Sequence, residues 1–230
     1  MRFAIYYAPE SNSLLHQLGS HWLGHDALTG AALDQPGEGL LIGKTEAAKR
    51  YGFHATLKAP FHLRHGKFEQ HVKQEARQLA TVLNPVTIDR LTVCEIEGFL
   101  ALVPETQSAE IDSFAAACVR SFDHLRKETD AGELARRHEA GLTLRQSQQI
   151  ADWGYPYVFE DFRFHITLTK KLHGEDLRSA KVLAENHFAA VNGKPLTINN
   201  ISIFAEPDGG GQFQIIEQLS IGNSIMAAFA

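Results

Sequence analysis

Hydrophobic and polar positions recur along the chain with two different periods, and the changes of period mark alternating strands and helices. Short aromatic and β-branched runs bounded by Gly, Pro or Asp indicate strands, which we expect at Phe3–Ala8, Val86–Cys94, Phe99–Val103, Leu196–Phe204 and Gln212–Leu219. Apolar residues at helical spacing indicate helices, which we expect from Ser11 or Ser13 to Gly24, and at Thr45–Arg50, Phe68–Leu83, Ile111–Arg126, Gly132–Trp153 and Glu175–Val191. The pattern therefore predicts an α+β protein.

Two further strands carry near copies of one pentapeptide. The first copy is Phe53-His54-Ala55-Thr56-Leu57, and the second, within an expected strand at Phe162–Thr169, is Phe164-His165-Ile166-Thr167-Leu168. Side chains two positions apart point to the same face of a strand. Each copy should therefore present one imidazole and one hydroxyl on one face and apolar side chains on the other.

The spacing of the two copies indicates an internal repeat. His54 and His165 lie 111 positions apart in a chain of 230 residues, and a helix and a strand follow each of them at a similar distance. We expect a single bilobal domain over residues 1–230, with repeated halves at roughly 1–97 and 98–230 and a helical segment inserted at about 130–153. The predicted fold is α+β, with two pseudo-symmetric lobes, each a small mainly antiparallel sheet with outer helices, around a central cleft that both motifs face.

Composition narrows the classes of function and the location. A hydrophobic fraction of 44%, a formal charge of −5 and a pI near 6.2 disfavour general coating of nucleic acid, which needs a surplus of Lys and Arg. Cys94 and Cys118 lack metal-ligand spacing and are expected to be small core residues. The N-terminal residues lack the long apolar region of a signal peptide, and no later run reaches membrane-spanning length. We expect a cytoplasmic protein without a membrane partner, whereas the oligomeric state is not predictable.

The tetrads His54-Ala55-Thr56-Leu57 and His165-Ile166-Thr167-Leu168 resemble the paired His-x-Thr motifs of the 2H phosphoesterase superfamily, which includes RNA 2′,3′-cyclic phosphodiesterases first described as RNA ligases. The surrounding segments 51–58, 153–157 and 162–169 are most similar to the bacterial subgroup encoded beside phosphonate-degradation (carbon-phosphorus lyase) genes. The resemblance runs nearly end to end. Two departures are Ala59, where a second proline beside Pro60 is expected, and Lys170-Lys171, where Gly-Arg is expected.

The motif residues suit the cleavage of a cyclic phosphodiester. One imidazole can deprotonate the attacking water and another can protonate the departing alkoxide, because an unperturbed histidine titrates near pH 6.5. We assign these roles to His54 and His165, without distinguishing base from acid, and we expect Thr56 and Thr167 to donate hydrogen bonds to the phosphoryl oxygens. This chemistry needs no metal and no other cofactor. Alternatively, both histidines are core residues beside strand-favouring threonines.

Strand alternation nominates further binding residues. Lys58 lies two positions after Thr56 and Arg163 two before His165, so each motif strand should direct one cation to the site, unless both are solvated charges at strand ends. Tyr51, Tyr155 and Tyr157 are candidates for stacking on a base or sugar, with packing against the sheet as the alternative. Three further arginines in the inserted segment are either a lid or a solvated helix face: Arg136, Arg137 and Arg145.

Two histidine pairs have spacings that can bind a metal, His21 with His25 and His62 with His65. Neither pair has an evident third ligand, so no metal site is predicted.

The predicted function is that of a metal-independent phosphoesterase or cyclic phosphodiesterase acting on a small nucleotide or sugar phosphate, with a role in phosphonate metabolism implied by the resemblance. Two alternatives stay open. One is a protein that binds a phosphorylated metabolite without turnover, and the other is an enzyme that processes RNA 2′,3′-cyclic ends, with an RNA end as partner.

Overall fold

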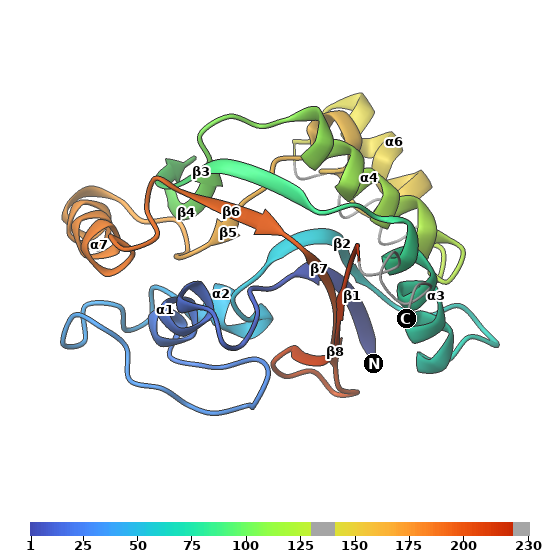
Figure 1. The fold of residues 1–230 in the computed structure, drawn as a ribbon, viewed down its shortest axis with the longest axis horizontal. Helices are drawn as coiled ribbons and strands as arrows, with labels where there is room; N and C mark the ends of the chain where they lie inside the picture. The colour runs from blue at the N-terminus through green and yellow to red at the C-terminus, as the bar shows by residue number, and fades with distance from the viewer. Residues whose placement is uncertain (130–140, 223–230) are drawn as a thin grey trace, which may run out of the picture.

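The computed structural model describes residues 1–129 and 141–222, and the strands in this part of the chain form one sheet (Figure 1). The strands are β1 (Arg2–Tyr7), β2 (Ala55–Phe61), β3 (Val86–Ile96), β4 (Phe99–Pro104), β5 (Ile166–Thr167), β6 (Lys194–Ile198), β7 (Asn200–Glu206) and β8 (Gln214–Ser220). Their order across the sheet is β6-β3-β4-β5-β2-β1-β7-β8, with every neighbouring pair antiparallel.

The two strands that carry the motifs are neighbours in the middle of this sheet. The pairing of β2 with β5 is short, with Ala55 opposite Ile166. On one side of this junction lie β4, β3 and β6, and on the other lie β1, β7 and β8. The predicted α+β class is confirmed, and the two groups of strands are continuous through the motif pair rather than separated by it.

The third strand of each expected half pairs with at least one strand of the other half. β3 pairs with β4 and β6, whereas β7 pairs with β1 and β8. Only Asn199 separates β6 from β7, so the single strand expected at Leu196–Phe204 is broken in two. Since one run of chain reaches both groups of strands, the sheet must curl strongly, as Figure 1 shows. The boundaries of the repeat at roughly 97 and 98 remain a prediction.

The helices are α1 (Leu14–Leu23), α2 (Glu46–Tyr51), α3 (Glu69–Val82), α4 (Ala109–Asp123), α6 (Leu144–Trp153) and α7 (Gly174–His187), with a 3-10 turn η1 (Phe159–Asp161). Their ends follow local chemistry. Ser13 accepts a hydrogen bond from the backbone N–H of His16 at the start of α1, and Gly24 ends that helix in the left-handed conformation. In the inserted segment, residues 130–140 lie outside the described part of the chain, and α6 begins with a capping box between Thr143 and Gln146.

The helices gather in two places around the sheet. α3, α4 and α6 lie together on one flank, and α1, α2 and α7 lie toward the opposite end (Figure 1). α4 packs against β2, so the motif strand is supported by a helix. No helix in the described residues is both long enough and apolar enough to cross a membrane.

The core holds the motif strands in place through large buried side chains. Trp22, Phe122, Phe164 and Phe188 are almost completely excluded from solvent, and burying a side chain of this size contributes about 1.5–3 kcal/mol. The indole N–H of Trp22 also donates to the carbonyl of Leu168, 2.9 Å away, which ties α1 to the second motif.

Two expectations about local structure are wrong. The second motif strand is limited to Ile166–Thr167, because Phe164 gives its backbone N–H to the side-chain oxygen of Gln107 instead of to a neighbouring strand. Cys118 is buried in α4 as expected, but Cys94 is exposed because it lies on an open part of β3.

Candidate active site

The pairing of β2 with β5 brings the two motifs together. Ala55 and Ile166 are opposite each other and completely buried. Adjacent side chains in a strand point to opposite faces, so the flanking histidines and threonines share the other face, where all four are half-buried. Continuing the antiparallel register places His54 beside Thr167 and Thr56 beside His165. Each imidazole therefore lies next to the hydroxyl of the other motif.

Both imidazoles are held by the same backbone contact. The Nδ1 atom of His54 lies 2.9 Å from the carbonyl oxygen of Gly52, and that of His165 lies 2.8 Å from the carbonyl oxygen of Arg163. A carbonyl oxygen only accepts hydrogen bonds, so Nδ1 carries the proton in each ring. The Nε2 atoms are consequently the ones that can take or give a proton at the site.

His54 lies in an enclosed environment that keeps it uncharged. Its ring stacks on the buried ring of Tyr6, with 3.7 Å between the ring centroids and 23° between the planes. Burial lowers the pKa of His54 to about 4. The hydrogen bond to the Gly52 carbonyl acts in the opposite direction, and the nearby His165 lowers the pKa further. Its neutral Nε2 accepts a hydrogen bond from the hydroxyl of Thr56 over 3.2 Å.

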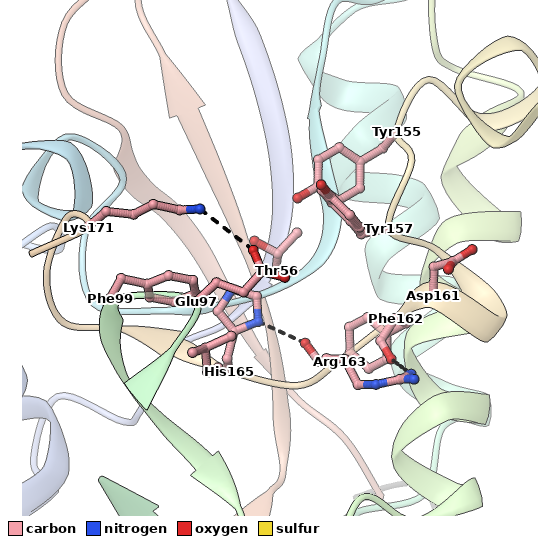
Figure 2. Close-up of a pocket in the computed structure, with 11 residues that line it drawn as sticks. Thr56, Glu97, Phe99, Tyr155, Tyr157, Asp161, Phe162, Arg163, His165 and Lys171 are labelled. Carbon is pink, nitrogen blue, oxygen red and sulfur yellow. Dashed lines mark hydrogen bonds and ion pairs between the residues drawn. The ribbon is translucent and has the colours of Figure 1, made fainter. Parts of the chain in front are cut away.

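A pocket of about 370 Å³ opens beside His165 and Thr56; we call it the motif pocket. Figure 2 shows Tyr155 and Tyr157 on one side, Phe99 and Lys171 on the other, and the two motif residues between them. The two tyrosine rings are nearly perpendicular, with 5.6 Å between their centroids. The remaining lining residues are Ile96, Glu97, Asp161, Phe162 and Arg163. The lining therefore combines four Phe and Tyr rings and one isoleucine with six polar or charged side chains.

Of the five binding candidates named from the sequence, Tyr155, Tyr157 and Arg163 line the motif pocket, whereas Lys58 and Tyr51 do not. The guanidinium of Arg163 donates to the carbonyls of Glu160 and Phe162, at 3.1 and 2.6 Å, and points away from His165 (Figure 2). The ring of Tyr51 stacks on that of Phe213, with 5.2 Å between the centroids. Tyr51 is also a neighbour of His54, with 6.3 Å between the ring centroids, but it does not line the pocket.

Lys58 does not lie at the pocket, which corrects the argument from strand alternation. Ile5 pairs with Lys58 and Tyr6 with Thr56, so β2 has one more residue than β1 at this point, which is a β-bulge. Alternation does not carry across a bulge. Lys58 is 3% exposed, and its ammonium group lies 2.8 Å from the carboxylate of Asp123 at the end of α4.

The turn between β3 and β4 forms one side of the pocket, and this side was not predicted from the sequence. Glu97 and Gly98 form this two-residue turn with positive φ angles of 47° and 90°, and Phe99 follows it. The ammonium group of Lys171 lies 3.7 Å from the Glu97 carboxylate, and both side chains are exposed. The Lys170-Lys171 pair was the available signal for this cation, because it departs from the expected Gly-Arg.

The remaining candidates lie elsewhere. Arg145 is paired with Asp161 at the rim through two bonds of 2.7 Å, whereas Arg136 and Arg137 are outside the described residues. His25 is buried, and His62 contacts the carbonyl of Met1 at 3.2 Å. Within residues 1–129 and 141–222, no group of three or more His, Cys, Asp or Glu side chains is arranged to hold a metal ion.

Comparison with known sequences identifies relatives along most of the chain. A family described as "Protein of unknown function (DUF1045)" matches residues 56–214. A protein of Janthinobacterium sp. (strain Marseille) is 41% identical over 221 residues, which are 92% of this chain and 49% of the relative. A protein of Laribacter hongkongensis (strain HLHK9) is 35% identical over 217 residues, or 94% and 50% of the two chains. Both are named ribose 1,5-bisphosphate phosphokinase PhnN. The chain spans about half the length of these curated relatives.

Solved structures with a similar course of the chain have low sequence identity. LigT of E. coli complexed with 3′-AMP has a TM-score of 0.43 and 10% identity, with 96% of this chain and 97% of that chain covered. TT0787 of Thermus thermophilus has a TM-score of 0.46 and 13% identity, with 96% and 98% covered. Likenesses at this level carry no assignment of chemistry, which must come from the site.

Proposed function

This chain belongs to the family described as "Protein of unknown function (DUF1045)", and we propose its function from the geometry of its site. We propose that it is a phosphoesterase of the 2H type that opens a cyclic phosphodiester with water. One observation carries this proposal. Two His-x-Thr motifs from distant parts of the chain lie on adjacent strands, in a register that places each imidazole beside the hydroxyl of the other motif. Both rings are held through Nδ1, which leaves both Nε2 atoms for proton transfer.

The environments of the two rings support different roles. The pKa of about 4 leaves the Nε2 atom of His54 unprotonated at neutral pH, so we assign His54 as the base that takes a proton from water. A bound phosphodiester, which is negatively charged, would raise this pKa toward neutrality. His165 would then donate a proton to the departing alkoxide, and the products are a phosphomonoester and a free hydroxyl.

Thr56 and Thr167 supply the hydrogen-bond donors for the nonbridging oxygens. Each lies in register beside the opposite histidine, so a phosphoryl group between the imidazoles would be flanked by both hydroxyls. Donors aimed at these oxygens stabilise the charge that develops in the transition state. The Thr56 hydroxyl, which donates to Nε2 of His54 in the free protein, has to turn to the phosphoryl group when the substrate binds. No residue in this scheme requires a metal ion, and the assay below tests that point with a chelator.

The pocket supports a small substrate. A volume of about 370 Å³ lies at the lower end of the range for small-molecule sites. Its aromatic side chains can pack on a nucleobase or on the apolar face of a sugar. The name of the two relatives, which refers to a ribose 1,5-bisphosphate, favours a ribose phosphate. We propose a cyclic phosphate of a small nucleotide or sugar as substrate, with a role in phosphonate metabolism.

The test is hydrolysis of three substrate types in the presence of a chelator, followed by phosphorus NMR: 2′,3′-cyclic nucleotides, ribose 1,2-cyclic phosphates and oligonucleotides with cyclic ends. The variants are His54→Ala and His165→Ala, and the matched control is His65→Ala, which removes an exposed histidine that does not line the pocket. We expect losses of about 10²- to 10⁴-fold in the first two variants and no loss in the control.

Two other outcomes of this assay would favour a different function. Binding of these compounds without product, at equal affinity in His54→Ala, would indicate a protein that only binds phosphometabolites. A preference for oligonucleotide ends, with affinity that falls steeply with salt, would indicate RNA end processing.

A further inference from the structure

A cluster of three charged side chains, two of them buried, lies at the end of α6, just before the segment that carries Tyr155 and Tyr157. Lys58 and Arg126 are 3% and 8% exposed, and the Lys58 ammonium and the Arg126 Nε atom each lie 2.8 Å from the same oxygen of Asp123. Burial lowers the pKa of Lys58, against the effect of Asp123. Burial also acts to raise the pKa of Asp123, but hydrogen bonds from Arg126 and Lys58 hold it below its usual value. Two cations share one carboxylate, so the cluster carries a surplus positive charge.

This surplus charge is directed at the end of α6. Arg126 donates from Nη2 to the carbonyl of Asp152 over 2.7 Å, and the Lys58 ammonium lies 3.5 Å from the carbonyl of Trp153. The last carbonyls of a helix have no partners within it and carry partial negative charge. The final turn of α6 contains no basic residue of its own. Side chains from β2 and from the segment after α4 therefore supply these donors.

The chain leaves α6 directly over the Arg126 side chain. Gly154 has a φ of 78°, and a Cβ atom at this position would lie 2.9 Å from Cδ of Arg126. The next residues, Tyr155 and Tyr157, line the motif pocket. Lys58, two residues after Thr56 on β2, is thus linked through Asp123 and Arg126 to the end of α6, and the chain continues from there into the segment with Tyr155 and Tyr157.

We propose that Lys58 and Arg126 are positioning residues that hold the Tyr155–Tyr157 wall in place against the motif strand, and so set how tightly the non-reacting part of the substrate is bound. Tyr155 and Tyr157 line the pocket beside His165 and Thr56, and neither has a role in the proton transfers assigned above to the two histidines. Its displacement should therefore weaken substrate binding more than it slows the chemical step.

The first measurement is the fluorine NMR spectrum of protein labelled with 5-fluorotryptophan. The chain contains two tryptophans. Trp153 ends α6 at the cluster, whereas Trp22 is buried in the core beneath the second motif. In Lys58→Met and Arg126→Met we expect the Trp153 signal to shift or broaden and the Trp22 signal to stay unchanged. Trp22 thus reports in the same spectrum whether the protein remains folded, and a Trp153→Phe sample assigns the signals.

The second measurement is steady-state kinetics on the best substrate of the panel. KM should rise about tenfold with kcat nearly unchanged in both variants. The matched control is Lys73→Met, which removes a more exposed lysine paired with Glu69 on α3 and should alter neither tryptophan signal nor KM. Arg126→Lys serves if the methionine variants do not fold, because it keeps the charge beside Asp123 but shortens the donor that reaches Asp152.

Two results would overturn the inference. An unchanged Trp153 signal in variants that fold would mean that the cluster does not hold this segment. A loss of kcat at constant KM would mean that the cluster acts on the chemical step. The kinetic readout rests on the proposed function, whereas the fluorine spectrum needs no substrate, so failure of one can be distinguished from failure of the other.

Discussion

The two Phe-His-x-Thr-Leu motifs are nearly identical in sequence, yet their histidines lie in different surroundings. The residue opposite Thr56 on β1 is Tyr6, and its ring covers His54. The residue opposite Thr167 on β4 is Ala101; the β4 ring next to His165 is that of Phe99, tilted and 6.0 Å away, and His165 lines the pocket. The pentapeptide fixes which atoms face the site, whereas the neighbouring strand determines how much water and charge each ring encounters.

The largest expected effect concerns whether the two halves act together. If both imidazoles serve one phosphoryl group, the His54→Ala and His165→Ala variants should each lose about 10²- to 10⁴-fold in kcat. The double variant should then lose little more than either single one, because groups that act as a unit have non-additive effects. The measurement is kcat for all three variants on one substrate. Losses that multiply in the double variant would show that the motifs act independently.

The next effect separates the two threonines. Thr56 lines the motif pocket and lies 3.2 Å from Nε2 of His54, whereas Thr167 does not line the pocket. Removal of one fixed donor to a developing oxyanion costs about 10²-fold or more. We expect a loss of about this size in kcat for Thr56→Val and a smaller loss for Thr167→Val, which is its matched control. Equal losses in the two variants would mean that the hydroxyls contribute symmetrically despite their different exposure to the pocket.

The sequence was sufficient for the features that depend on local chemistry. Ser13 and Gly24 mark the ends of α1 as expected. The two tetrads predicted a shared polar face, and the register of Ala55 with Ile166 provides it. Both features depend on residues close together in the chain, for which periodicity and capping preferences are informative.

Features that depend on pairing between distant strands were not predictable. The bulge in β2 arises from its register against β1, and it places Lys58 beside Asp123 instead of at the pocket. Phe99 lines the pocket on the side opposite Tyr155 and Tyr157 because β4 pairs with β5, which lies more than sixty residues later in the chain. No local pattern reports such a register, so alternation alone overestimated the cationic character of the site.

A smaller effect concerns stability. The pKa of His54 is lowered to about 4 in the folded protein, against about 6.5 for an unperturbed histidine in the unfolded chain. The unfolded state therefore binds more protons between these values, so the stabilising contribution is complete above about pH 6.5 and is lost as the pH falls toward 4. Between pH 7.5 and pH 5, wild type should lose about 2 kcal/mol more free energy of unfolding than His54→Gln, which cannot titrate.

Denaturant unfolding at the two pH values measures this difference. His65→Gln is the control, because His65 is exposed, and it should follow the wild type. Parallel losses in wild type and His54→Gln would mean that His54 does not titrate differently in the folded state.

The smallest expected effect tests the comparison directly, through the Tyr6 ring that stacks on His54 at 3.7 Å, whereas the ring of Phe99 lies 6.0 Å from that of His165 and is tilted. The groups that face His54 are Tyr6 from β1, Tyr51 from α2 at 6.3 Å, and His165 from the second motif. Burial raises the pKa of the Tyr6 phenol further above neutrality, so Tyr6 is uncharged and acts on His54 by excluding water. Tyr6→Leu removes the stacked ring and should raise the pKa of His54 by about one unit, because burial is the largest cause of its low value. Tyr6→Phe keeps the ring and should leave that pKa nearly unchanged.

Titration of the imidazole signals by NMR measures both variants without any substrate. If His54 titrates alike in Tyr6→Leu and in wild type, the β1 neighbour does not account for the difference between the motifs, and the enclosure of His54 must come from its other neighbours, which include Tyr51 and Phe204.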